Sequence, residues 1–302
     1  MIIRDWAATA LKRTLQNPGL YLQTGAFTTC IQSAIPSVAQ GIAQLYADFP
    51  VAPPDTFADF HVRLTQPKNL RRWLQPQVLF LHDGLPPFRP LPLDQAYPML
   101  EWGLNWCISG HAHQYLIIHA AVIERNGCAA ILPAPPGSGK STLCAALIQR
   151  GWRLLSDELT LIRSDGNIAP LARPVSLKNA SIEIIRNFEP KAIISRAAHD
   201  TAKGTVAHLR PPMESVARAA EIAPPAWIIF PQYSAGASAS LRRRPKAQTF
   251  MELARNAFNY TLHGAHGYAL LNQVVDSCTC FDFSYSQLDD AVKIFSELRP
   301  PQ

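Results

Sequence analysis

The pattern of apolar and polar positions divides the chain near residue 112. Before that point, it predicts a short helix over 36–50 and strands within "TFADFHVRL" and "PQVLFLHDG". A helix follows in "LDQAYPMLEWGLNWCISGHAHQ", where apolar residues recur at helical spacing and Pro98 falls in the first turn or at a kink. We therefore predict a smaller N-terminal α+β region over residues 1–111.

After residue 112, β-branched runs and helical segments alternate. "QYLIIHAAVIERNG" and "CAAILPAP" are joined at Asn126-Gly127, which is a strong hairpin signal. "KSTLCAALIQRG" reads as a helix that Gly151 caps, and "WRLLS" and "ELTLIR" read as strands. Hairpins and βα steps occur together, so we predict an α/β domain over 112–302 with a mixed sheet.

Composition fits a globular chain, because 48% of the 302 residues are hydrophobic and 17% are charged. No apolar run is long enough for a membrane span, and the start of the chain is a poor secretory signal. We therefore predict a cytoplasmic protein without a membrane span. The six cysteines form no disulfide framework, and the C-x-C pair at 278–280 lacks the second ligand pair that a zinc site needs.

The formal net charge of +6 is spread along the chain, with local clusters at 71–72 and 242–246. Aromatic residues do not interleave with these clusters as they do in a base-stacking surface, so we predict no nucleic-acid partner. The excess positive charge suits an anionic substrate such as a nucleotide.

The string "PPGSGKST" carries the clearest chemistry, because it lies between a predicted strand and a predicted helix. It follows the pattern G-x-x-x-x-G-K-[ST], except that the small residue Ala134 stands at the first glycine. Backbone amides around the two glycines cradle phosphates, the lysine charge faces the β and γ phosphates, and the serine is placed to bind Mg²⁺. The predicted binding residues are Pro136, Gly137, Ser138, Gly139, Lys140, Ser141 and Thr142.

An acidic pair, Asp157-Glu158, lies 17 residues after Lys140, at the strand that follows the helix. The carboxyl end of a strand next to the loop is where ligands bind in open α/β sheets. Consecutive strand residues point to opposite faces, so both carboxylates reach one site only if the chain bends. The alternative is that one carboxylate faces the phosphate and the other lies on the surface.

Three segments together carry a family resemblance: His119, the loop "PPGSGKST", and "GWRLLSDE". Over about residues 115–190 the chain resembles HPr kinase/phosphorylase, and more closely the proteins called HprK-related kinase A. The closer resemblance extends through "RPVSLKN", "GTVAHLRPP" and "NAFNY". Two features depart from HPr kinase: its Arg-Gly-Leu-Gly signature is absent, and the first hundred residues do not resemble its amino-terminal domain.

The resemblance implies a P-loop kinase core that uses ATP and Mg²⁺ to phosphorylate a hydroxyl. It implies that Asp157 takes the hydroxyl proton, that Ser141 and Glu158 bind Mg²⁺, and that His119 lies near the transferred phosphate. The apolar run "LIIHAAV" alone favours a core histidine, and the resemblance reverses that interpretation. The implied acceptor is an unidentified peptide, protein or metabolite.

Charge on the transferring phosphoryl group also needs a cation. The candidates are Lys178, His208 and Arg210, and we predict Arg210 because "GTVAHLRPP" reads as a loop that can close over the site. A surface arginine is the alternative.

Two other functions remain open: a nucleotide-binding switch or scaffold, and a carboxykinase, for which we find no set of manganese ligands. The N-terminal region has no chemical motif. We predict that it selects the substrate or forms an interface, which leaves a homo-oligomer open.

Overall fold

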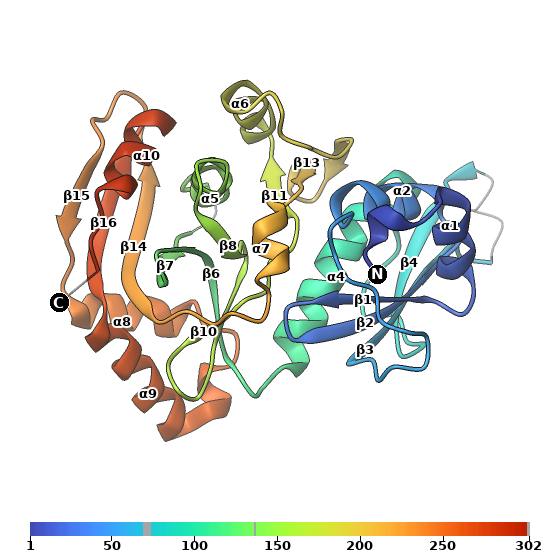
Figure 1. Ribbon diagram of the computed structural model, residues 1–302, viewed down its shortest axis with the longest axis horizontal. Helices are drawn as coiled ribbons and strands as arrows, with labels where there is room; N and C mark the ends of the chain where they lie inside the picture. The colour runs from blue at the N-terminus through green and yellow to red at the C-terminus, as the bar shows by residue number, and fades with distance from the viewer. Residues whose placement is uncertain (69–73, 136, 301–302) are drawn as a thin grey trace.

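The structure is a computed structural model, and it describes residues 1–68, 74–135 and 137–300. The described residues form a mixed α/β fold with sheets of five, eight and three strands (Figure 1). No described helix is both long enough and apolar enough to cross a bilayer.

The five-stranded sheet belongs to the N-terminal region, and its strands lie in sequence order with one parallel pair, β2 and β3. The predicted helix and strands in this region form as α2, β3 and β4, and Pro98 lies in the first turn of α4. The elements are α1 (Ala8–Gln16), β1 (Leu20–Thr24), β2 (Phe27–Ser33), α2 (Pro36–Leu45), β3 (Phe60–Thr65), β4 (Gln77–His82), β5 (Leu91–Pro92) and α4 (Ala96–His111).

The eight-stranded sheet has the order β10-β9-β6-β7-β14-β16-β15, and β8 also pairs with β6. Strand β14 is parallel to β7 and β16, and the other pairs are antiparallel, so the sheet is mixed as predicted. Its strands are β6 (Leu116–Arg125), β7 (Cys128–Pro133), β8 (Arg153–Ser156), β9 (Leu159–Ile162), β10 (Ile168–Ala169), β14 (Pro225–Tyr233), β15 (Ser240–Arg243) and β16 (Thr279–Tyr285).

Helices cover both faces of this sheet, because its strands carry apolar residues on both sides. Buried residues of α5 (Lys140–Ile148) and α10 (Leu288–Ser296) pack in one core cluster. Those of α8 (Lys246–Arg255) and α9 (Tyr260–Ser277) pack in another. The predicted β6–β7 hairpin is confirmed, with Asn126 and Gly127 both at positive φ (54° and 78°). The predicted glycine cap after α5 is also confirmed, since Gly151 has a φ of 88°.

The three-stranded sheet contradicts one prediction. The segment "GTVAHLRPP" is not a loop, because most of it is β13 (Gly204–Leu209), the central strand between β11 (Val175–Lys178) and β12 (Ala198–Thr201). Its apolar residues Val206, Ala207 and Leu209 are fully buried, which is the reason it pairs on both sides. Helix α6 (Ala180–Phe188) lies between β11 and β12 in the chain.

The N-terminal region shares its core with the edge of the main sheet. Leu100 and Leu104 of α4 belong to the same buried cluster as Leu159 and Leu161 of β9. The two parts are therefore packed together, and a domain boundary at residue 111 stays a prediction.

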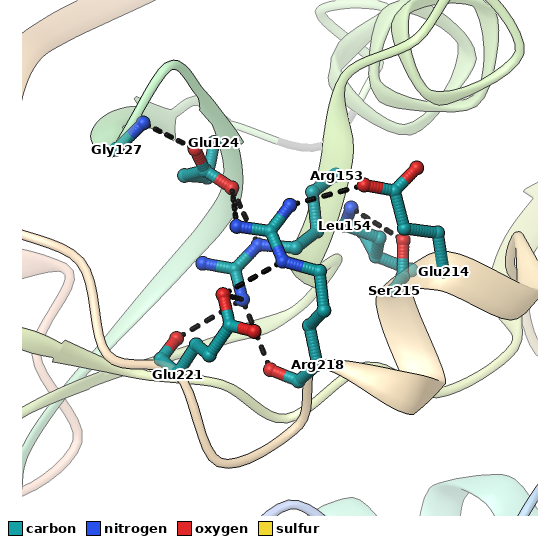
Figure 2. A network of polar contacts seen from close by, with 8 residues as sticks. All are labelled: Glu124, Gly127, Arg153, Leu154, Glu214, Ser215, Arg218 and Glu221. Atoms are coloured by element: carbon teal, nitrogen blue, oxygen red, sulfur yellow. Dashed lines mark hydrogen bonds and ion pairs between the residues drawn. The ribbon is translucent and has the colours of Figure 1, made fainter.

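A buried polar network fixes β8 at the end of the strand away from the acidic pair (Figure 2). Arg153 donates to Glu124 Oε2 at 2.5 Å and to the carbonyl oxygens of Arg218 and Glu221 at 3.0 Å each. Ser215, in the short helix α7 (Met213–Ala217), accepts the N–H of Leu154 at 2.9 Å. These partners come from β6, from α7 and from the turn after α7. They fix the start of β8, and so the direction in which the strand runs toward the acidic pair at its other end.

Candidate functional site

The loop between β7 and α5 has the backbone that a phosphate cradle requires. Gly137 and Gly139 both have a φ of 87°, a conformation that side chains disfavour. A Cβ at Gly139 would also lie 2.5 Å from Tyr285 Oη, so glycine is required there on steric grounds. The predicted contact Pro136 lies outside the described residues.

Two neighbouring strands hold the loop in place. Tyr233, at the end of β14, donates its backbone N–H to the carbonyl oxygen of Ser138 at 2.9 Å. Tyr285, at the end of β16, donates its hydroxyl to the carbonyl oxygen of Gly139 at 3.0 Å. Both strands run parallel to β7, so their carboxyl ends meet the loop at the same edge of the sheet.

The loop offers donors that suit an anion. Helix α5 makes its first backbone bond from Leu143 N–H to Gly139, at 2.9 Å, so the N–H groups of Lys140, Ser141 and Thr142 have no partner within the helix. Ser138 Oγ is buried and has no hydrogen-bond partner among the described residues. The helix dipole adds a partial positive charge at this end. These groups fit the phosphates of a nucleotide.

Lys140 connects the loop to the acidic pair. Its side chain is buried, with 8% of its surface exposed, and Nζ donates to the backbone carbonyl of Asp157 at 3.0 Å. The ammonium group therefore lies between the glycine loop and the acidic pair.

The acidic pair occupies a bend between β8 and β9, both of which run antiparallel to β6. Ser156 pairs with Val122 and Leu159 pairs with His119, so Asp157 and Glu158 interrupt the ladder between these pairs. Both carboxylates line the same small cavity. The bend that the sequence analysis required for both acids to reach one site is therefore present.

Asp157 is buried with one carboxylate oxygen free. Oδ2 accepts the N–H of Ser176 at 3.2 Å, and Oδ1 has no partner among the described residues. Burial raises the pKa of Asp157 above its usual value, while the charge of Lys140 opposes that rise. A carboxylate with raised pKa and a free oxygen is suited to accept a proton.

Glu158 has a different environment, although it is the next residue. Oε2 accepts a hydrogen bond from Asn105 Nδ2 at 2.6 Å, and Oε1 lies 3.8 Å from Lys178 Nζ. Burial raises the pKa of Glu158, but the charges of Lys203, Lys178 and Lys140 outweigh burial and lower it overall. Glu158 therefore stays ionised and can serve as a metal ligand.

The donor set for Mg²⁺ is sparse. No group of three or more His, Cys, Asp or Glu side chains that could hold a metal occurs in the part of the chain that the structure describes. Mg²⁺ in nucleotide sites is commonly held by one or two protein oxygens together with phosphates and waters. Half-buried Ser141, in the first turn of α5, and Glu158 fit that arrangement.

His119 lies on β6, which pairs with β7 before the glycine loop on one side and with β9 after the acidic bend on the other. Side chains alternate along a strand, so His119 shares a face with Ala121 and Ile123, which pack in the cluster that contains α5. Burial, with a contribution from the charge of Lys140, lowers the pKa of His119 to about 4. Its imidazole is therefore neutral at pH 7.

A cavity of about 20 Å³, room for roughly one water, lies beside the acidic bend. Helix α4 of the N-terminal region forms one wall with Glu101, Trp102 and Asn105. Ser176 and His208 also line it, and neither Ser176 Oγ nor the two ring nitrogens of His208 have a hydrogen-bond partner among the described residues. Sequence reasoning missed the α4 residues, because only tertiary packing brings them to the site.

Arg210, the predicted cation, forms an ion pair with an aspartate of the N-terminal region. Its Nε donates to Asp48 Oδ2 of the N-terminal region at 3.0 Å, and Arg4 pairs with the same carboxylate. The lysines whose charges lower the pKa of Glu158 are Lys203, Lys178 and Lys140. Lys203 was missed, because its segment carries no motif that marks it.

Comparisons with known proteins give limited similarity. A family profile described as SynChlorMet cassette protein ScmC matches residues 99–206, which are 108 of the 302 residues and run from α4 into β13. No curated protein matches the chain. One solved structure that resembles it is the HPr(Ser) kinase/phosphatase from Coxiella burnetii, with 11% identity and a TM-score of 0.27. That match covers 60% of this chain and 95% of the other.

Proposed function

We propose that the protein is an ATP-dependent kinase that transfers the γ-phosphoryl group to a hydroxyl of an unidentified peptide, protein or small-molecule acceptor. The observation that carries this proposal is Oδ1 of buried Asp157, which has no hydrogen-bond partner among the described residues. The backbone carbonyl of the same residue accepts a hydrogen bond from Lys140 of the glycine loop. A nucleotide switch needs the lysine and the loop, but it has no use for a base next to them.

The chain's own groups divide the work of such a transfer. The loop amides and Lys140 bind the phosphates, and Ser141 and Glu158 are the residues that would hold Mg²⁺. Bound MgATP supplies an activated phosphoryl group whose charge the metal partly neutralises. Asp157 accepts the proton of the acceptor hydroxyl, for which its raised pKa is favourable.

The N-terminal region is proposed to select the acceptor. Support comes from α4, because Trp102 and Asn105 line the cavity beside the acidic bend. Asn105 also positions Glu158 through its hydrogen bond. The region thus contributes walls of the site, although it carries no catalytic motif of its own.

The nucleotide part of the proposal is tested by calorimetric titration of MgATP into the full chain. Lys140→Met keeps much of the side-chain volume and removes the charge, so we expect affinity to fall by at least about tenfold. Lys12→Met, at an exposed position of α1, is the matched control and should bind like the wild type. Equal MgATP affinity in wild type and folded Lys140→Met would overturn the assignment of the loop.

A further inference from the structure

Two lysines of the three-stranded sheet reach the site from outside the phosphate loop. Lys178 is the last residue of β11, and Lys203 lies in the turn between β12 and β13. Neither belongs to the loop or to the acidic pair. The positive charges of both lysines lower the pKa of Glu158.

The backbone brings these two lysines to one corner of the sheet. Lys178 pairs with Val206 of β13, three residues after Lys203. Asn179, the residue after Lys178, donates its N–H to the carbonyl of Thr205 at 2.8 Å and accepts the N–H of Thr205 on Oδ1 at 3.0 Å. The turn that carries Lys203 is therefore tied directly to the end of the strand that carries Lys178.

The turn is also sterically specified. Gly204 has a φ of 79°, and a Cβ at this position would lie 2.3 Å from Asn179 Oδ1. Only glycine satisfies both the conformation and the close approach. The backbone of the turn that carries Lys203 is thus held beside Lys178 by the two hydrogen bonds between Asn179 and Thr205 and by the conformation of Gly204.

The side chains of both lysines extend toward the acidic bend and α4. Lys178 Nζ is 3.8 Å from Glu158 Oε1, and Lys203 Nζ is 5.6 Å from the centre of the Trp102 ring. Lys203 is exposed over much of its side chain, but desolvation of its ammonium group lowers its pKa, and Lys178 and Lys140 add to this effect. The two ammonium groups therefore lie beside Glu158 and Trp102, two residues that line the same cavity.

The charge of this corner is unbalanced. Lys140, Lys178 and Lys203 bring three positive charges, whereas the acidic pair Asp157 and Glu158 supplies at most two negative charges. Partly desolvated like charges are unfavourable unless an anion enters among them.

We propose that Lys178 and Lys203 bind the terminal phosphoryl group of ATP together with Lys140, and that this lysine pair, in place of Arg210, stabilises the charge of the transferring group. This inference rests on the proposed kinase function. It assigns the ligand class of the corner as a nucleoside triphosphate, recognised at its γ-phosphate.

The test compares MgATP with MgADP by calorimetry in the full chain. Wild type should bind MgATP more tightly than MgADP. Lys178→Met and Lys203→Met should each lower MgATP affinity by about tenfold while MgADP affinity stays within about twofold, because ADP lacks the contacted group. Lys191→Met, an exposed lysine of the segment between α6 and β12, is the control for net charge and should keep the wild-type preference.

Charge-conserving Lys203→Arg guards against a folding effect and should retain most of the preference for MgATP. Equal losses for both nucleotides, or no loss for either, would overturn the assignment of the lysine pair while leaving the kinase proposal intact. Failure of wild type to bind any nucleotide would instead overturn the proposed function, and this inference with it.

Discussion

Asp157 and Glu158 are adjacent in the chain, yet their surroundings shift their pKa values in opposite directions. Burial dominates at Asp157 and raises its pKa. At Glu158, burial acts in the same sense, but three lysines outweigh it. Where two neighbouring acids have pKa values shifted in opposite directions, the acid with the raised pKa is suited to accept a proton. The acid with the lowered pKa stays charged and is suited to bind a cation.

The pKa of the single residue His119 can be measured without knowing the acceptor. Its pKa of about 4 lies below the ordinary 6.5, so the unfolded chain binds more protons between these values. The contribution of His119 to stability is therefore complete above pH 6.5 and is lost as the pH falls toward 4. We expect NMR titration of the His119 ring, assigned with His119→Gln, to give a midpoint near 4.

Lys140→Met should raise that midpoint toward 6.5, because Lys140 contributes to the lowered pKa after burial. Lys12→Met serves as the control and should leave the midpoint unchanged. A wild-type midpoint near 6.5 would contradict the half-buried position of the ring between the loop and the acidic bend.

At the scale of elements, the parts of the site that follow local rules were predictable from the sequence. The hairpin at Asn126-Gly127 depends on the backbone conformation of two adjacent turn residues. The helix that begins at Lys140 depends on the spacing of apolar residues and on the glycine that follows it, Gly151. Both signals can be read from neighbouring residues in the sequence. The lysine corner was not predictable, since β11 and β12 have four residues each and form a sheet only through pairing with β13. The placement of Arg210 beside Asp48 depends likewise on packing across 162 positions of sequence.

The turn between β12 and β13 yields a prediction at this scale. Gly204→Ala adds a Cβ that would clash with Asn179 Oδ1 and strains a residue at positive φ. We expect the turn to shift and the MgATP preference to weaken as it does in Lys203→Met, while MgADP binding persists. Gly236→Ala is a control of similar backbone strain, with φ at 76° and no atom of the described residues within 4 Å of the added Cβ. Equal MgATP preference in Gly204→Ala and wild type would contradict the role of the turn.

At the scale of the whole molecule, a buried ion pair joins the N-terminal region to the site. Glu101 of α4 accepts hydrogen bonds from Arg173 at 2.7 Å, from Tyr46 at 2.8 Å and from Tyr97 at 2.6 Å. Arg173 also donates to Asn105, the partner of Glu158, at 2.7 Å. The hydrogen bonds of Glu101, Arg173 and Asn105 therefore connect the fold of the N-terminal region to the position of Glu158 in the acidic pair.

Glu101→Ala should destabilise the fold by about 3–5 kcal/mol, because it leaves the buried guanidinium of Arg173 without its charged partner. Urea unfolding at pH 7 measures this change. Glu183→Ala removes an exposed glutamate of α6 and should change stability by less than about 0.5 kcal/mol. Similar unfolding midpoints for the two variants would show that the ion pair does not join the two parts of the molecule.

Asp157 is the proposed base of the phosphoryl transfer. Asp157→Asn keeps the shape and the bond to Ser176, and a neutral amide suits the buried position, so the variant should fold. It cannot accept the hydroxyl proton. The most direct measurement follows the γ-phosphoryl of labelled MgATP into water and into acceptors found by screening, alongside calorimetric MgATP affinity.

We predict that MgATP affinity of Asp157→Asn stays within about threefold of wild type, while transfer falls by about 10²-fold or more, the effect of removing a positioned base. Glu158→Gln should instead raise the Mg²⁺ concentration needed for transfer. Transfer at the wild-type rate by Asp157→Asn would contradict the role of Asp157 as the base. Nucleotide binding by the wild type without any transfer would instead favour a nucleotide-binding switch.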